Sequence, residues 1–400
     1  MEANIEFEYV SNANSNYKLG SKKRKKNLKL GKGLMIIFYI VIIIIIIFVI
    51  NKYKLFQIKQ RNEIYNRISN LKTKNYNLQQ QLNQANEMII KLYNKISINN
   101  QYIIFTQEIN QKYKEEQNFF CDNILFFINN EFENQIQKSK IKFYGKIYDM
   151  FIYSDSDNVS RSIMKAKSWE GGCTLKILKA LNFYTNKTNS KNEDLYILDI
   201  GGNVGWYSFY LGKYDYNIMS FEPTERNFYI LKKNYCLNRD INITIINKGL
   251  FTSEKECDYY ENIGNKGNGM VLCHQRNDIP SFLQKKSVVI LTKLKNFIPF
   301  LSEKKVAFMK IDVEGAEKDV ILGGIELISK YHVPFIFLEF SPGLLKLHDS
   351  NNRNFLEIFE NNGYKISISN FLDKNYVSID YLLKTKGIFN LYIIYTKILE

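Results

Sequence analysis

The chain predicts an α/β fold in which a mostly parallel, doubly wound sheet carries helices on both faces. From about residue 140 onward, short apolar runs with strand character alternate with helical runs, as in strands joined by crossover helices. The expected strands are residues 196–200, 217–221, 243–246, 306–311 and 333–338, with 365–369 and 391–395 as closing strands. The expected helices include residues 225–234, 317–331 and 352–361. No proline precedes Pro223, which suits long helices in the N-terminal half.

Upstream of this domain the sequence predicts a membrane anchor. Residues 34–50 are apolar or aromatic throughout and would form about 25 Å of helix, enough for a thin bilayer. The run is longer than the apolar part of a signal peptide and lacks a small-residue cleavage site after it, which favours a retained span. We therefore expect a basic tail, a transmembrane helix, a helical stalk and a globular domain, at residues 1–32, 33–50, 51–139 and 140–400.

The charges beside the span predict its orientation. More basic residues precede the apolar run than follow it, so we expect a cytosolic tail and a single-pass type II protein. The domain would then lie in the lumen of the endoplasmic reticulum or Golgi. Three Asn-X-Ser/Thr triplets would there be candidate glycan acceptors, at Asn158, Asn186 and Asn242.

The expected stalk has a heptad pattern. Apolar residues repeat every seven positions in two series that start at Ile64 and Ile68 and reach Ile103, with Asn75 at a core position. This pattern predicts a parallel coiled-coil homodimer, and the alternative is a single amphipathic helix packed on the domain.

Composition argues against two kinds of ligand. The formal charge of +15 comes from a basic block before the apolar run and from scattered lysines, so it does not favour a nucleic acid as partner. The five cysteines include no Cys-X-X-Cys pair and no histidine at zinc-ligand spacing, so we expect no metal site built from them.

A glycine-rich turn carries the clearest chemical signal. Asp199 ends an expected strand, and Gly201, Gly202 and Gly205 follow before a helix begins at Trp206. Glycines there let the backbone approach a ligand, and a helix start offers free N–H groups. The spacing differs from the GxGxxG of dinucleotide sites. An acid at residue 199 would repel a pyrophosphate and attract the cationic methionyl end of S-adenosylmethionine.

Acidic residues also follow the neighbouring strands. Glu222 ends the next strand, where an acid can accept hydrogen bonds from both ribose hydroxyls of a nucleoside. Asp312 and Glu314 follow the buried strand at 306–311 and should emerge beside the ligand crevice. Asp312 is the candidate proton acceptor for an attacking hydroxyl, with Glu314 beside it. Glu317 is expected to open the following helix.

These motifs together resemble the FkbM-like methyltransferases over about residues 140–395. The matching segments are LDIGGNVGWYS, FEP at 221–223, KIDVEGAE from 310 and LEFSP at 338–342. The resemblance implies a class I methyltransferase fold, S-adenosyl-L-methionine as cofactor and O-methylation of a sugar or another small hydroxyl compound. It adds Asn203 within the turn, and Glu170 from a lead-in segment, as residues near the cofactor.

Two departures affect the acceptor side. The family's Leu-Asp-Asp segment is here Leu294-Lys295-Asn296, and residues 257–283 match poorly. A Golgi-type glycosyltransferase remains an alternative, because Asp155-Ser156-Asp157 imitates the metal-binding acids of those enzymes, although Asp157 is also a plausible helix cap. A non-catalytic membrane adaptor with the same fold is the other alternative.

Overall fold

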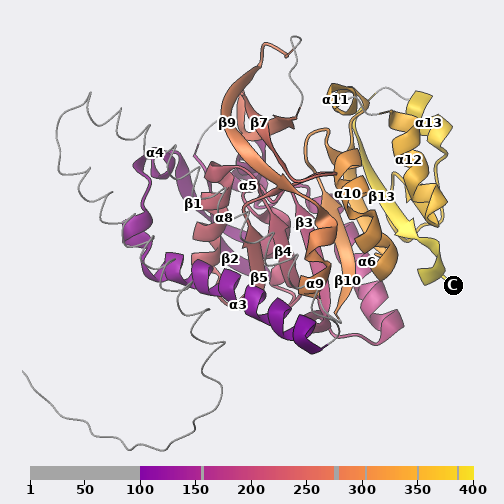
Figure 1. The fold of residues 1–400 in the computed structure, drawn as a ribbon, viewed down its shortest axis with the longest axis horizontal. Coiled ribbons are helices and arrows are strands. Elements are labelled where there is room, and N and C mark those ends of the chain that lie inside the picture. The colour runs from indigo at the N-terminus through magenta and orange to yellow at the C-terminus, as the bar shows by residue number, and fades with distance from the viewer. Residues whose placement is uncertain (1–99, 155–156, 274–278, 302–303, 349–350, 385–386) are drawn as a thin grey trace, which may run out of the picture. The chain divides into compact units, whose positions relative to one another are not determined.

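The computed structural model describes residues 100–154, 157–273, 279–301, 304–348, 351–384 and 387–400 (Figure 1). They belong to one compact unit, Ile98–Glu400. The predicted tail, the transmembrane helix and the stalk as far as residue 99 lie outside the described residues. Within the described ranges, no helix has both the length and the apolar character needed to cross a membrane.

A seven-stranded sheet forms the centre of the unit. Its strand order is β12-β13-β11-β10-β3-β4-β5, and β13 alone runs against its two neighbours. This mixed sheet is the class I methyltransferase-like arrangement that the sequence predicts. In chain order the strands are β3 (Leu195–Ile200), β4 (Asn217–Phe221), β5 (Ile243–Ile246), β10 (Lys305–Ile311), β11 (Phe335–Phe340), β12 (Tyr364–Ser367) and β13 (Phe389–Tyr395).

Helices cover both faces of this sheet, so its central strands are buried on two sides. On β3, Ile197 packs in one hydrophobic core, whereas its neighbour Leu198 packs in the other. The first core includes α5 (Asn158–Ala166), α6 (Gly171–Thr188), α7 (Trp206–Gly212) and α8 (Glu225–Leu237). The second includes α9 (Ile298–Leu301), α10 (Glu317–Tyr331), α11 (Pro342–Leu347), α12 (Asn352–Asn361) and α13 (Ile379–Lys384).

The strand order reverses beside β3, which pairs with β4 on one side and β10 on the other. At such a point, the connections that follow two neighbouring strands run to opposite faces of the sheet. A crevice therefore opens at the carboxyl ends of these strands. The turn after β3 is tied to the neighbouring strand, because the N–H groups of Gly201 and Gly202 both donate to the Phe221 carbonyl, at 3.0 and 2.9 Å. The predicted ligand crevice is therefore at the β3 end.

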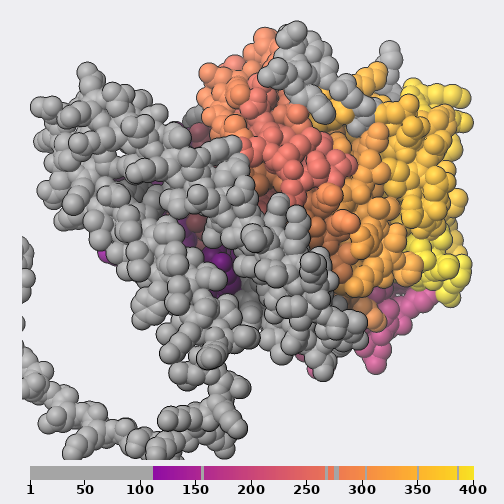
Figure 2. All heavy atoms as spheres, viewed as in Figure 1, coloured from indigo at the N-terminus to yellow at the C-terminus, as the bar shows by residue number. Residues whose placement is uncertain are grey.

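Two smaller sheets were not predicted from the sequence. One is the hairpin of β1 (Ile136–Phe143) and β2 (Lys146–Tyr153). The other has the order β6-β9-β7-β8, and a disulfide between Cys257 and Cys273 joins its β7–β8 hairpin. Figure 2 shows part of this second sheet, in salmon and orange, exposed in the upper part of the view. Its strands are β6 (Gly249–Leu250), β7 (Lys255–Asn262), β8 (Asn265–Leu272) and β9 (Leu283–Thr292).

Helix α3 (Asn100–Asp122) lies along the edge strand β5 and helix α8 (Figure 1). The buried Gln117 amide pairs with that edge: its nitrogen donates to the Ile243 carbonyl at 3.1 Å, and its oxygen accepts from the Ile245 N–H at 2.8 Å. Capping an edge strand in this way removes its exposed hydrogen-bonding groups. A disulfide from Cys121 to Cys236 fixes α3 to α8. The compact unit thus includes residues 100–122, which the sequence assigns to the stalk.

Short elements complete the chain. They are η1 (Ile124–Phe127), α4 (Asn130–Glu133), η2 (Asn192–Asp194), η3 (Leu294–Phe297) and η4 (Thr396–Ile398).

Candidate functional site

The glycine turn after β3 is crowded by the protein itself. Gly201 has φ +81°, and a Cβ there would lie 1.9 Å from the Asp312 carbonyl oxygen. A Cβ on Gly202 would lie 2.4 Å from the Ser220 hydroxyl oxygen. The turn is thus pressed between the ends of β10 and β4, so these glycines are needed for packing. From the sequence, these glycines were expected to let a ligand approach the backbone. The close contacts within the protein are a second, independent reason for glycine at these positions.

Asp199, at the end of β3, is a buried acid with a cation beside it. Its side chain is 1% exposed, and its Oδ2 accepts a hydrogen bond from Ser208 at 2.6 Å. Its Oδ1 lies 3.8 Å from the Lys310 ammonium and accepts no hydrogen bond from the described residues. Burial raises the pKa of Asp199, while Lys310 and the Ser208 hydroxyl oppose that rise.

Glu222 lies just after β4 and bridges the glycine turn to the start of α8. Its Oε2 accepts from the Asn203 N–H at 2.9 Å, and its Oε1 accepts from the Thr224 N–H and hydroxyl at 3.0 and 2.7 Å. Burial raises the pKa of this carboxyl, which is 4% exposed, and these hydrogen bonds act in the opposite direction. Asn203 adopts a left-handed conformation, with φ +49°, that directs its N–H toward Glu222.

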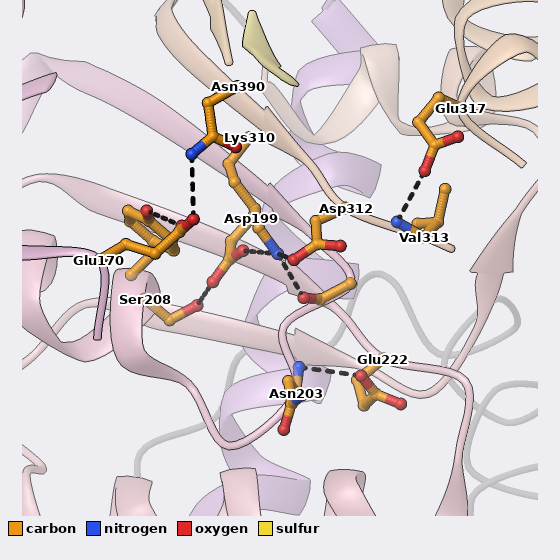
Figure 3. A network of polar contacts seen from close by, with 12 residues as sticks. Glu170, Asp199, Asn203, Ser208, Glu222, Lys310, Asp312, Val313, Glu317 and Asn390 are labelled. Carbon is orange, nitrogen blue, oxygen red and sulfur yellow. Dashed lines mark hydrogen bonds and ion pairs between the residues drawn. The ribbon is translucent and has the colours of Figure 1, made fainter. Parts of the chain in front are cut away.

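Lys310 joins the β3 end to the β10 end (Figure 3). Its Nζ donates to the Gly201 carbonyl at 2.7 Å and lies 3.3 Å from Asp312 Oδ2. The sequence analysis did not select this residue, although it is part of the KIDVEGAE segment. The register of β10 against β3 reveals its role, because Lys310 lies directly opposite Asp199.

The segment after β10 gathers further acids. Glu317 opens α10 as predicted, and its Oε1 accepts from the N–H groups of Gly315 and Val313 at 3.1 and 3.3 Å. Burial raises the pKa of Glu317 to about 7, and the same cause raises the pKa of Glu339, near the end of β11, to about 7. Burial and then the charge of Asp312 raise the pKa of Glu314 well above its usual value. These carboxyl groups are close enough for their negative charges to repel one another, which adds to the rise in pKa.

Glu170 lies within electrostatic reach of Lys310 and Glu339. It precedes α6 with φ +43°, and its Oε2 accepts from the Tyr207 hydroxyl at 2.6 Å. Its Oε1 accepts from the Asn390 amide of β13 at 3.2 Å (Figure 3). Asn390 in turn pairs in register with Glu339. The sequence analysis selected Glu170 from the resemblance but neither of its two partners, which come from distant segments.

The structure therefore places the predicted residues in two groups. Asn203 and Glu222 form the group on the β4 side of the turn. The second group lies at the ends of β3, β10 and β11, and Glu170 borders it through Asn390. Gly205, with φ +94°, precedes α7 and joins the turn to the helix. The second group consists of the predicted Asp199, Asp312 and Glu314, and Lys310 and Glu339 join it in the structure.

No group of three or more His, Cys, Asp or Glu side chains among the described residues has the geometry to hold a metal ion. Asp157, which the glycosyltransferase alternative uses as a metal ligand, is 1% exposed and caps α5 by accepting from the Ser160 N–H at 2.6 Å. Its position is explained by the helix cap that the sequence also predicted.

The residues fit S-adenosylmethionine in charge and in hydrogen-bonding capacity. Asp199 Oδ1 is a buried acceptor without a hydrogen-bond donor among the described residues, and the crevice around it is acidic. A cavity beside Glu222 has a volume of about 40 Å³, which is room for a few waters, so a purine enters only if the lining moves. That lining is largely apolar, as a flat base requires, and includes Phe221, Pro223, Leu250 and Val313.

Comparisons with known proteins agree on the family. Residues 199–366 match the family model described as the methyltransferase FkbM domain. A protein named Methyltransferase 1 from Beauveria bassiana (strain ARSEF 2860) is 31% identical over 147 residues, which are 33% of this chain and 59% of that protein. The chain thus spans about three-fifths of the length of this curated relative.

Two solved structures show the range of similar folds. A methyltransferase FkbM from Methylobacillus flagellatus KT is 15% identical, with a TM-score of 0.31 over 59% of this chain and 60% of that one. A 16S rRNA N2 G1207 methyltransferase (RsmC) from T. Thermophilus, solved with AdoMet and guanosine, is 10% identical, with a TM-score of 0.33 over 65% and 50%. Residues 199–366, which include the glycine turn and the strand-end acids, are therefore the part of this chain that is similar to the methyltransferase FkbM domain.

Proposed function

We propose that this chain is a methyltransferase that transfers a methyl group from S-adenosylmethionine to a hydroxyl group of a small acceptor such as a sugar. One observation carries the proposal: acids end three adjacent strands around one glycine turn. Asp199 lies on β3, Glu222 follows β4, and Asp312 follows β10. This is the switch point of the sheet, where ligands of doubly wound folds bind.

On the cofactor side, each acid has a distinct task. Asp199 offers its Oδ1 to the methionyl ammonium, and Glu222 offers its remaining acceptor capacity to the ribose hydroxyls. Gly201, Gly202, Asn203 and Gly205 shape the turn between them. The bound cofactor supplies an electrophilic methyl group on a positively charged sulfur.

On the acceptor side, Asp312 is the group that orients the attacking hydroxyl and accepts its proton. It is 37% exposed at the side chain, unlike Asp199, so an acceptor can reach it. The Asp312 carboxylate would accept the hydroxyl proton as the acceptor oxygen bonds to the methyl carbon and the carbon–sulfur bond breaks, with its electron pair left on sulfur. Glu314 and Glu170 line the same crevice, and Glu170 is held by Tyr207 and Asn390.

We also propose that the enzyme is a type II membrane protein with its domain in the lumen of the Golgi or endoplasmic reticulum. The apolar run at residues 34–50 and the basic segment before it support this. Two disulfides, Cys121–Cys236 and Cys257–Cys273, also support it, because such bonds persist in oxidising compartments. The heptads at residues 64–103 support a parallel homodimer through the stalk.

The proposed reaction is tested by comparing metabolites of knockout cells with those of cells complemented by wild-type or Asp312→Asn protein. Wild-type protein should restore compounds heavier by one methyl group, and an extract of knockout cells should serve as acceptor in vitro. The Asn variant should lower turnover by about a hundredfold or more, because the proton acceptor is lost, with cofactor affinity nearly unchanged. Full activity of the Asn variant would remove Asp312 from catalysis, and an equal loss of cofactor binding would place it on the cofactor side.

A further inference from the structure

Lys310 is the buried cation of the candidate site. Its side chain is 5% exposed and lies among three acceptors that come from two strands. The Nζ atom is 2.7 Å from the Gly201 carbonyl, 3.3 Å from Asp312 Oδ2 and 3.8 Å from Asp199 Oδ1. One N–H of the ammonium donates to the Gly201 carbonyl, and the two carboxylates interact with the ammonium as ion pairs.

The neighbours of Lys310 keep it charged. Burial alone lowers the pKa of the ammonium, but the attraction of Asp312 and Asp199 outweighs burial and raises the pKa above its ordinary value. The Tyr207 ring lies 5.8 Å away on the α7 side. Three further acids interact with Lys310, namely Glu170 before α6, Glu314 in the loop after β10 and Glu339 near the end of β11.

We propose that Lys310 is a positioning residue that couples the cofactor side of the site to the acceptor side. One ammonium holds the Gly201 turn and Asp199, which serve the cofactor, against Asp312, which serves the acceptor. The inference rests on the proposed function and adds to it a role for a residue that contacts neither substrate. Through this ion, displacement of one carboxylate is transmitted to the other.

The coupling has a signature that a purely structural lysine lacks. Burial raises the pKa of Asp199, and Lys310 lowers it. Without the ammonium the pKa of Asp199 rises further, so the carboxyl takes up a proton at a higher pH. A protonated Asp199 no longer attracts the methionyl ammonium. Cofactor affinity should therefore fall toward acid pH in a Lys310→Met variant and recover as the pH rises.

The test measures binding of S-adenosylhomocysteine, which carries the same methionyl ammonium, to the full chain in detergent by calorimetry at pH 6, 7 and 8. We expect the Lys310→Met variant to bind about tenfold or more weakly at pH 6 than at pH 8, since one pKa unit corresponds to a tenfold change in protonation. The wild type should vary much less over this range. Lys310→Arg keeps the charge and should retain much of the wild-type pH profile.

Lys233→Met is the matched control. Lys233 is also buried, at 8% side-chain exposure, and pairs with Glu133 away from the glycine turn. Its loss should lower stability without changing the pH dependence of binding. If Lys310→Met fails to fold, the Asp199→Asn/Lys310→Met double variant removes the unpaired buried charge and should fold, with weak but pH-independent binding.

The coupling would be wrong if Lys310→Met protein bound with wild-type affinity at every pH. It would also be wrong if the double variant kept the pH dependence of Lys310→Met or still failed to fold. Wild-type protein that binds no S-adenosylhomocysteine would instead overturn the proposed function.

Discussion

At the residue scale, Glu222 has a structural task beside the ribose contact proposed for it. Its three hydrogen bonds hold Asn203 and Thr224 in place, so a bound ribose would share this carboxylate with these donors. The sequence predicted the acid and its strand end but not these donors, because they depend on the left-handed backbone at Asn203. A variant of Glu222 will therefore change both stability and binding, and the two effects must be measured separately.

We expect Glu222→Ala to weaken S-adenosylhomocysteine binding by about 10- to 150-fold, since hydrogen bonds to a charged partner contribute about 1.5–3 kcal/mol. Glu222→Asp should lose less, because a shorter acid still reaches one hydroxyl. Calorimetry on folded protein measures the affinity, and thermal unfolding measures the separate loss of stability. Glu133→Ala, which removes an acid from the Lys233 pair, is the control. Unchanged affinity of Glu222→Ala would exclude the ribose contact.

At the element scale, the segment between β10 and α10 is held by one acid whose ionisation affects folding. Glu317 is 2% exposed and has a folded-state pKa of about 7, against about 4.3 when unfolded. Its proton is therefore bound more tightly in the folded protein. The resulting stability is complete below the unfolded pKa and is lost as the pH rises toward 7.

We expect the free energy of unfolding of the wild type to fall between pH 5 and 7, and Glu317→Gln to reduce this slope. The amide oxygen of Gln still accepts from the Gly315 and Val313 N–H groups, so the loop keeps its anchor. Glu326→Gln, at an exposed position on the same helix, should leave the slope unchanged. Denaturant titrations between pH 5 and 7 measure the slope of the unfolding free energy against pH. An identical slope in Glu317→Gln and wild-type protein would show that Glu317 is not its cause.

Helix α3 gives a second prediction at this scale. Its disulfide closes a segment with a sequence separation of 115 residues, so replacing Cys121 and Cys236 by Ser should lower the free energy of unfolding by about 2–4 kcal/mol. Hydrogen exchange should become faster in α3 first, because only non-covalent contacts, such as those of Gln117, Asn118 and Asp122, would then hold it on the domain. The comparison is the replacement of Cys257 and Cys273, whose disulfide closes a shorter segment. Equal protection of α3 with and without its disulfide would show that the bond is not needed there.

Regular elements with one dominant pattern were predictable from the sequence. The structure has α10 and α12 at the predicted bounds, and β4 and β5 as well. The β7–β8 hairpin was not predicted because both strands are rich in polar residues. In the site, strand-end acids were predictable from position alone. Lys310, Tyr207 and Asn390 were not, because their roles depend on the register and on contacts between distant segments.

At the scale of the whole molecule, the proposed luminal location predicts glycosylation. The triplet residues Asn158, Asn186 and Asn242 are all exposed in the structure. Full-length protein should shift in mobility after endoglycosidase treatment, and its C-terminus should resist protease in sealed microsomes. Asn186→Gln, Asn158→Gln and Asn242→Gln identify which site carries the glycan. A C-terminus that protease reaches in sealed microsomes would reverse the topology.

The central claim is that the acids around the β3 turn bind S-adenosylmethionine, and binding of its product tests this most directly. Calorimetric titration of S-adenosylhomocysteine into wild-type full-length protein should give saturable binding with one site per chain. A parallel titration with NAD should give no binding, since Asp199 repels a pyrophosphate at the turn. A wild-type protein that binds NAD, or that binds neither compound, would contradict the account.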